Sequence, residues 1–162
     1  MDCRHIQFCV QKSAIDLYQL QKLFKLATFW ARERKIEDLE IAINNSNPVV
    51  SVWDKERIIG FARATSDGIY RATIWDVVIH PDYQKLGLGR KLVETVLSHP
   101  LVNRVERVYL MTTYQQKFYE RIGFEENQTT TMVLSNSSGA SPLPIPEQQL
   151  QQVLEESNTA IV

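Results

Sequence analysis

The sequence predicts one mixed α/β domain, and three observations lead to this fold class. The chain has 162 residues, enough for one hydrophobic core and too few for two ordinary domains. Three strand-like runs with short turns between them occupy residues 49–79, which is typical of an antiparallel meander. Segments with helical spacing of apolar residues flank these runs, and the third run leads through a glycine-bearing loop into a helix. We therefore expect a mostly antiparallel central sheet flanked by helices.

The elements before the meander are a strand and two helices. "IQFCV" at 6–10 alternates as a strand does. Ser13, with Asp16 three positions later, resembles a capping box, so we expect a helix from there to about Arg32. A weaker helical pattern covers residues 37–44 and stops at the Asn/Ser/Pro cluster before Val49.

The meander and the elements after it complete the order. The expected strands are 49–53, 58–66 and 70–79, with turns at 54–57 and at Asp67-Gly68. A helix with apolar residues at helical spacing follows the loop. After it we expect a strand at 105–112, a short helix at 114–121 that stops at Gly123, and a last strand over 124–134.

Composition and charge exclude several classes of protein. The chain is 44% hydrophobic and 23% charged, with a formal net charge of −1, which is typical of a soluble globular protein and indicates neither nucleic acid nor membrane as a partner. The first residues lack the features of a secretory signal, so we expect a cytoplasmic protein, or a stromal one if the chain is plastid-encoded. With 2 Cys and 3 His, we expect neither a disulfide framework nor a metal site.

The composition changes at Ser135. The segment 135–162 is rich in Ser, Pro and Gln and contains no aromatic residue. We therefore expect residues 1–134 to form the domain and residues 135–162 to form a flexible tail. The tail contains one potential short amphipathic helix through Leu150, Val153 and Leu154.

The loop "HPDYQKLGLGRKL" at 80–92 is the first candidate site. Gly87 and Gly89 stand where the third meander strand opens into a helix, and backbone N–H groups at such a helix start attract phosphate. An ordinary tight turn is the alternative. The loop lacks the Gly-Lys-Ser/Thr ending of a P-loop, and it follows an antiparallel meander rather than opening a parallel βαβ unit, which excludes the dinucleotide fingerprint.

Two motifs together resemble a known family. Residues 84–89, Gln-Lys-Leu-Gly-Leu-Gly, resemble the acetyl-CoA-binding motif of the GCN5-related N-acetyltransferases (GNAT superfamily), and "FYERIGF" at 118–124 resembles their second signature. The resemblance covers about residues 5–134 and implies the GNAT fold. In that fold the strands corresponding to about 72–79 and 105–112 form a parallel pair that splays apart around acetyl-CoA.

The resemblance also implies which residues bind the co-substrate. Backbone groups of Val77, Val78 and Ile79 would pair with the pantetheine amides, and an N–H near Val78 would polarise the thioester carbonyl. N–H groups from Leu86 to Arg90 would hold the pyrophosphate. The implied loop residues are Gln84, Lys85, Leu86, Gly87, Leu88, Gly89 and Arg90.

The resemblance implies direct acetyl transfer to an amine. Tyr119 stands at the position of the general acid that serves the leaving thiolate, and a packing role for its ring is the alternative. The amine must also lose a proton. Asp76, a carboxylate in an apolar strand, is the leading candidate for the base, with salt-bridging or binding of the ammonium as the alternative. His80 is a second candidate for the base because its unperturbed pKa suits proton transfer.

The acceptor amine is the least determined feature. The pair Trp75-Asp76 resembles the cyanobacterial and plant-plastid branch of the family, which includes serotonin N-acetyltransferase, and implies an arylalkylamine acceptor. The expected acceptor-binding residues are Trp75, Asp76, Thr112, Thr113 and Tyr114. Thr112 and Thr113 stand where relatives often have an acidic residue, which weakens the inference of an identical substrate.

Two further functions stay open. Plant relatives have been linked to protein acetylation, so a protein lysine or N-terminal acetyltransferase is the second candidate. A non-catalytic acetyl-CoA-binding module is the third. The resemblance is compatible with a monomer or a homodimer.

Overall fold

A computed structural model describes residues 5–134 of the chain. The chain divides into two units after Glu125, and each unit is described by itself. The predicted tail, residues 135–162, lies outside the described residues, as does its potential helix. Among the described residues no helix is both long and apolar enough to span a bilayer.

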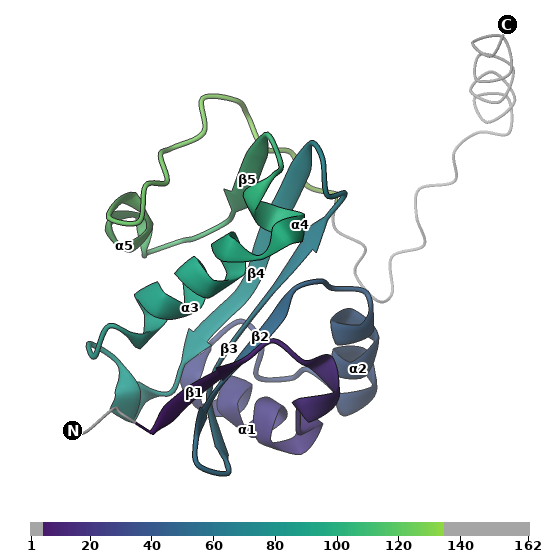
Figure 1. The fold of residues 1–162 in the computed structure, drawn as a ribbon, viewed down its shortest axis with the longest axis vertical. Coiled ribbons are helices and arrows are strands. Elements are labelled where there is room, and N and C mark those ends of the chain that lie inside the picture. The colour runs from purple at the N-terminus through teal and green to yellow at the C-terminus, as the bar shows by residue number, and fades with distance from the viewer. Residues whose placement is uncertain (1–4, 135–162) are drawn as a thin grey trace, which may run out of the picture. The chain divides into compact units, whose positions relative to one another are not determined.

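The first unit is built on one mixed sheet whose strands follow the order β1-β2-β3-β4-β5 (Figure 1). The pairs from β1 to β4 are antiparallel, and β4 and β5 are parallel. The strands are β1 (Ile6–Cys9), β2 (Val49–Asp54), β3 (Arg57–Ser66), β4 (Arg71–Ile79) and β5 (Arg107–Leu110). The predicted meander and the parallel neighbour are therefore confirmed.

Helices cover both faces of this sheet, and Figure 1 shows α3 along one face. That face buries the apolar side of α3, including Leu92, Val93 and Val96, against side chains of β2, β3 and β4. The opposite face buries Leu20, Leu23 and Phe24 of α1. The helices are α1 (Leu17–Ala27), α2 (Ile36–Asn44), α3 (Leu88–Ser98), α4 (Pro100–Asn103) and α5 (Gln116–Glu120).

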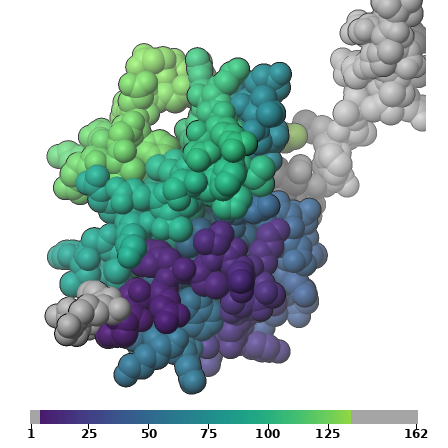
Figure 2. All heavy atoms as spheres, viewed as in Figure 1, coloured from purple at the N-terminus to yellow at the C-terminus, as the bar shows by residue number. Residues whose placement is uncertain are grey.

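The α3 face also reaches the first strand. In Figure 2 the green side chains of α3 lie directly against the purple side chains near the N-terminus, and Lys91 Nζ lies 4.7 Å from the ring centroid of Phe8 in β1. The long stem of lysine covers apolar surface while its ammonium stays accessible. This contact ties the helix behind the glycine loop to the far edge of the sheet.

The first helix begins later and ends earlier than the sequence predicted. Asp16, not Ser13, is the N-cap of α1, because its Oδ1 accepts hydrogen bonds from the N–H groups of Tyr18 and Gln19 at 3.0 Å. Ser13 lies in a short 3₁₀ turn, Lys12–Ala14. The helix ends at Ala27, and the Thr28 hydroxyl donates to the carbonyl of Phe24 and accepts from the N–H of Ala31. The Thr28 side chain thus caps the end of the helix, and residues 28–32, which were expected to be helical, form a loop.

The predicted last strand, 124–134, is wrong. The described residues after Gly123 form no strand. Met132, Val133 and Leu134 are 90%, 87% and 88% exposed. A composition that suits a strand is not sufficient to form one, because a partner strand must also satisfy its backbone groups. Among the described residues, β5 has a strand neighbour on one side alone, β4.

Candidate active site

The parallel pair β4 and β5 separates partway along β4. The last paired residues are Ile74 and Leu110, whereas β4 continues to Ile79 and stays paired with β3, where Phe61 lies opposite Val78. From Trp75 to Ile79, the side of β4 that faces away from β3 has no strand partner among the described residues. The predicted co-substrate residues Val77, Val78 and Ile79 lie on this open edge.

The glycine loop presents a run of free backbone donors at the end of β4. Lys85 and Gly87 have positive φ angles of 63° and 79°, and α3 begins at Leu88. Within the described part of the chain, the N–H groups of residues 86–90 have no hydrogen-bond acceptor, and the first bonded N–H is that of Lys91, to the Gly87 carbonyl at 3.1 Å. Free N–H groups gathered at a helix start form an anion site. The loop therefore fits a pyrophosphate.

The two glycines of the loop differ in what a side chain would do at their positions. A Cβ at Gly87 would meet nothing within 4 Å, so its positive φ, and not space, favours glycine there. A Cβ at Gly89 would lie 3.5 Å from Phe118 Cζ and 3.8 Å from Ile79 Cγ1. Gly89 thus leaves open the space between the end of β4 and α5.

Side chains of the loop hold it in place. Gln84 Nε2 donates to the carbonyl of Ile79 at 3.1 Å, which ties the start of the loop to the end of β4. Leu88 is buried in the core, and Leu86 is exposed. Arg90 Nε donates to Glu94 Oε1 at 2.7 Å on the surface of α3. Of these predicted residues, Gln84 and Leu88 therefore position the loop, whether or not they also contact a ligand.

Tyr119 lies on α5 within an aromatic group. Its ring centroid is 4.9 Å from that of Phe118 and 5.9 Å from that of Phe124, both in edge-to-face arrangement. Burial raises the pKa of Tyr119 to about 12, because the apolar surroundings disfavour a phenolate. The structure gives its hydroxyl no hydrogen-bond partner among the described residues. Tyr119 is thus a protonated donor at neutral pH.

Asp76 occupies an irregular position in β4. The register between β3 and β4 shifts between Phe61 and Arg63, and Asp76 has a φ of 58°, so an extra residue bulges out of β4 there. Its carboxylate accepts hydrogen bonds at Oδ2 from Arg34 Nη1 at 2.8 Å and from Arg63 Nε at 2.6 Å. Only 6% of the side chain is exposed. Of the predicted alternatives for Asp76, this geometry favours the salt bridge over the general base.

The two arginines were missed by the sequence reasoning. Arg63 also donates to Ser46 Oγ at 3.0 Å, and Arg34 lies with its guanidinium carbon 5.2 Å from the Phe24 ring centroid and 5.1 Å from that of Trp30. Arg34 precedes α2 and is separated from Asp76 by 42 positions. No local pattern marks such a pair, although an acid in an apolar strand implies a partner elsewhere.

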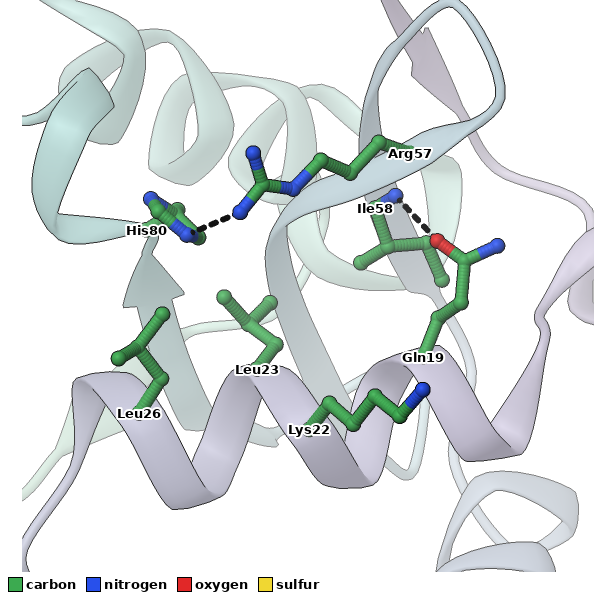
Figure 3. Close-up of a pocket in the computed structure, with 7 residues that line it drawn as sticks. All are labelled: Gln19, Lys22, Leu23, Leu26, Arg57, Ile58 and His80. Atoms are coloured by element: carbon green, nitrogen blue, oxygen red, sulfur yellow. Dashed lines mark hydrogen bonds between the residues drawn. The ribbon is translucent and has the colours of Figure 1, made fainter.

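His80 lies in a pocket on the α1 face of the sheet (Figure 3). The residue is 5% exposed, and its Nε2 lies 2.6 Å from Arg57 Nη2. Because a guanidinium can only donate, this nitrogen acts as an acceptor. Burial and then the Arg57 charge lower the pKa of His80, so the ring is neutral at pH 7. This contact leaves His80 poorly placed to accept a proton from a substrate amine.

The predicted acceptor residues separate into two groups. The indole N–H of Trp75 donates to Thr65 Oγ1 at 2.9 Å, and Thr112 Oγ1 accepts from the N–H of Gln115 at 3.1 Å, so both have structural partners. The carbonyl of Thr113 accepts from Gln116. Tyr114 is instead 76% exposed, and its ring centroid lies 6.4 Å from that of Phe29 in the loop after α1.

Comparison with known proteins agrees with this arrangement. The model of the acetyltransferase (GNAT) family matches residues 14–124. The chain is 38% identical over 120 residues to the uncharacterized N-acetyltransferase ycf52 of Pyropia yezoensis, covering 68% of this chain and 65% of the relative. It is 37% identical over 123 residues to the histone acetyltransferase TAP1 of Glycine max, covering 68% of this chain and 52% of the relative. The chain thus spans less than two thirds of the length of these relatives.

A solved structure shows the same fold. A GNAT-family protein from Xanthomonas campestris pv. campestris superposes with a TM-score of 0.71 at 24% identity, over 80% of this chain and 94% of the other. The matched family model includes β4, the glycine loop and α5. The half-paired β4, the free N–H groups behind it and the sequence match lead to one conclusion: the chain belongs to the acetyltransferase (GNAT) family.

Proposed function

We propose that the protein transfers an acetyl group from acetyl-CoA directly to a primary amine. The observation that carries this proposal is the run of free N–H groups at residues 86–90, directly after the open edge of β4. The N–H groups suit the pyrophosphate, and the edge suits the amide groups of an extended pantetheine. Acetyl-CoA would supply the activated thioester at this edge.

The chain's own groups then stabilise charge. An N–H on the open edge, at or next to Val78, would donate to the thioester oxygen as negative charge develops there. A C–N bond forms, the C–S bond breaks, and the proton lost by the amine balances the thiolate. Because the pKa of Tyr119 is raised to about 12, well above that of an ordinary thiol near ~8.5, Tyr119 acts chiefly by donating a hydrogen bond to the departing sulfur.

Deprotonation of the amine does not need a side-chain base in this scheme. Asp76 is paired with two arginines, and His80 accepts from Arg57. The amine would therefore react from its neutral fraction and lose its remaining proton to water. The rate should rise with pH toward the pKa of the acceptor amine.

The acceptor in this proposal is an arylalkylamine such as serotonin. Phe29, Trp30 and Tyr114 are 68%, 46% and 76% exposed, and Phe29 and Tyr114 bring the loop after α1 next to the loop after β5. Exposed aromatic rings offer stacking surface for an indole. The occupied carboxylate of Asp76 speaks against direct recognition of the ammonium by that residue.

A protein amine is the second candidate acceptor. The similarity to the histone acetyltransferase TAP1 of Glycine max supports it. The aromatic rings that support the first candidate are exposed at the surface, so a peptide segment has access to them as well.

One experiment separates these candidates. The protein is incubated with acetyl-CoA and, separately, with serotonin, tryptamine, a polyamine and a lysine peptide, and free thiol is followed. Faster release with the two indole amines than with the peptide supports the arylalkylamine. The reverse order supports a protein amine, and acetyl-CoA binding without thiol release from any amine supports a binding module.

A further inference from the structure

The cluster formed by Arg34, Asp76 and Arg63 carries an excess positive charge. Both guanidinium groups donate to the same oxygen, Oδ2 of Asp76. No second carboxylate pairs with either arginine within residues 5–134. Two cations therefore share one anion, so the cluster repels an ammonium and attracts a carboxylate.

The two arginines differ in side-chain exposure and in the number of N–H groups that remain available for a ligand. Arg63 uses Nε for Asp76 and Nη1 for Ser46, and its side chain is 16% exposed. Arg34 uses only Nη1, and its side chain is 32% exposed. Arg34 is thus the member of the cluster with N–H groups available for a ligand.

Arg34 is also held in one orientation before any ligand arrives. Its guanidinium lies against the rings of Phe24 and Trp30, and its carbonyl accepts from Gln21 Nε2 at 2.9 Å. A planar guanidinium fixed in this way binds a carboxylate with little loss of side-chain freedom.

The cluster lies near the part of β4 and the aromatic rings that are proposed to bind the acceptor. Asp76 is two residues before Val78 in β4, and Val78 packs against α1 on one face of the sheet. Trp30, which contacts Arg34, and Phe29 beside it are among the exposed rings that suit an aromatic acceptor. A carboxylate close to the acceptor amine would therefore come within reach of Arg34.

We propose that Arg34 forms a carboxylate subsite, and that the preferred acceptor among arylalkylamines is an aromatic amino acid, which carries a carboxylate beside its amino group. This inference rests on the proposed acetyl transfer to a primary amine and narrows its substrate class. The matched acceptors are serotonin and 5-hydroxytryptophan, which differ only in the α-carboxylate.

The first test compares kcat/KM for these two acceptors in the parent and in Arg34→Gln. The variant should lower the value for 5-hydroxytryptophan at least about tenfold more than the value for serotonin. Differences in the intrinsic reactivity of the two amines cancel in this comparison. Arg34→Lys keeps the charge without the planar fork. Its kcat/KM for 5-hydroxytryptophan should lie between the values of the parent and of Arg34→Gln.

Arg32→Gln is the matched control. Arg32 lies in the same loop, and its Nε donates to the carbonyl of Thr28 at 2.8 Å rather than to Asp76. The substitution removes the same charge and should leave the ratio between the two acceptors within about twofold, because an exposed charge is largely screened. An equal loss in Arg32→Gln would overturn the specific role of Arg34.

The second test needs neither turnover nor a variant. Binding of indole-3-propionate and of its neutral amide to the parent protein is measured by calorimetry in the presence of CoA. The acid should bind at least about tenfold more tightly, and equal binding would overturn the subsite. If Arg34→Gln lowers kcat/KM equally for both acceptors, the carboxylate subsite is overturned and the proposed acetyl transfer stands. If no amine is acetylated, the proposed function itself is overturned.

Discussion

Arg63 Nε donates to Asp76 Oδ2 at 2.6 Å across the irregular pairing of β3 and β4. Arg34 donates to the same oxygen from the loop before α2. One carboxylate thus joins the central sheet to the loop after α1 at the point where β4 leaves its parallel neighbour. This relationship assigns to Asp76 the task of holding the site together.

Replacing Asp76 by Asn should reduce stability without changing the pH profile. Asn tolerates a positive φ and keeps an acceptor oxygen, so the substitution removes mainly the charge. We expect the free energy of unfolding to fall by about 1–3 kcal/mol, while the pH at half-maximal kcat/KM stays that of the acceptor amine. Denaturant melts and a pH series measure both. Loss or displacement of the rising limb would return Asp76 to the role of base.

The control for this prediction is Asp82→Asn. The Asp82 side chain is 72% exposed and lies 3.7 Å from His80 Nδ1. Removing an exposed charge of this kind usually changes stability by less than about 0.5 kcal/mol.

Tyr119→Phe should separate turnover from binding. The hydroxyl is the part of the ring that would serve the leaving sulfur, whereas the ring packs against Phe118 and Phe124. We expect kcat to fall about 100-fold and the Kd for acetyl-CoA to change less than about threefold. Tyr70→Phe, which alters an exposed tyrosine, is the control. Unchanged kcat in Tyr119→Phe would leave the residue with a packing role only.

The same tyrosine should make the protein sensitive to alkali. The pKa of Tyr119 is raised from an ordinary value of 10.0 to about 12, so the unfolded chain releases this proton first as pH rises. Its contribution to stability is complete below pH 10 and is lost as the pH rises to about 12, by at most about 2–3 kcal/mol. Urea melts of the parent and of Tyr119→Phe should diverge over that range, because only the parent loses stability as the pH rises. Parallel curves would show that the hydroxyl is not desolvated.

The two loop glycines should respond differently to alanine. Gly87 has a φ of 79°, so Gly87→Ala should cost about 1–2 kcal/mol of stability through backbone strain. Gly89→Ala meets only ordinary contacts and should keep or slightly raise stability through helix propensity. Both should raise the Kd for acetyl-CoA: Gly87→Ala because backbone strain displaces the N–H groups of the loop, and Gly89→Ala, by at least about fivefold, because its methyl group fills space next to Ile79 and Phe118 at the end of β4.

Gly68→Ala serves as the control for both. Gly68 has a similar φ of 78° in the turn between β3 and β4, so its replacement should lower stability and leave the Kd unchanged. An unchanged Kd in Gly89→Ala would contradict the assignment of this loop to the pyrophosphate.

Sequence reasoning succeeded where local pattern and backbone preference determine the outcome. Short turns define the strands of the meander, and α3 begins at the glycine-bearing loop as expected, with Gly87 as its N-cap. It failed where the structure depends on which side chain forms a contact or on whether a partner strand is available. Asp16 rather than Ser13 caps α1, since either residue type can cap a helix. The stretch 124–134 has the composition of a strand but forms none among the described residues.

The same distinction between local and long-range determinants applies to the candidate site. The motif located the N–H groups of the loop and the tyrosine of α5, because each depends on a short contiguous segment. Arg34 and Arg63 meet Asp76 from 42 and 13 positions away, and no spacing rule joins them. The bulge at Asp76 is equally hidden, since its φ of 58° depends on pairing between β3 and β4.

Direct acetyl transfer from acetyl-CoA to an amine is tested by the stoichiometry of a single reaction. The protein is incubated with acetyl-CoA and an aromatic amine, and free thiol and N-acetylated amine are quantified in the same samples. Direct acetyl transfer gives equal molar amounts of both products, and neither should form when the amine is omitted. Thiol release without acetylated amine, or acetyl-CoA binding with neither product for any amine tested, would contradict it.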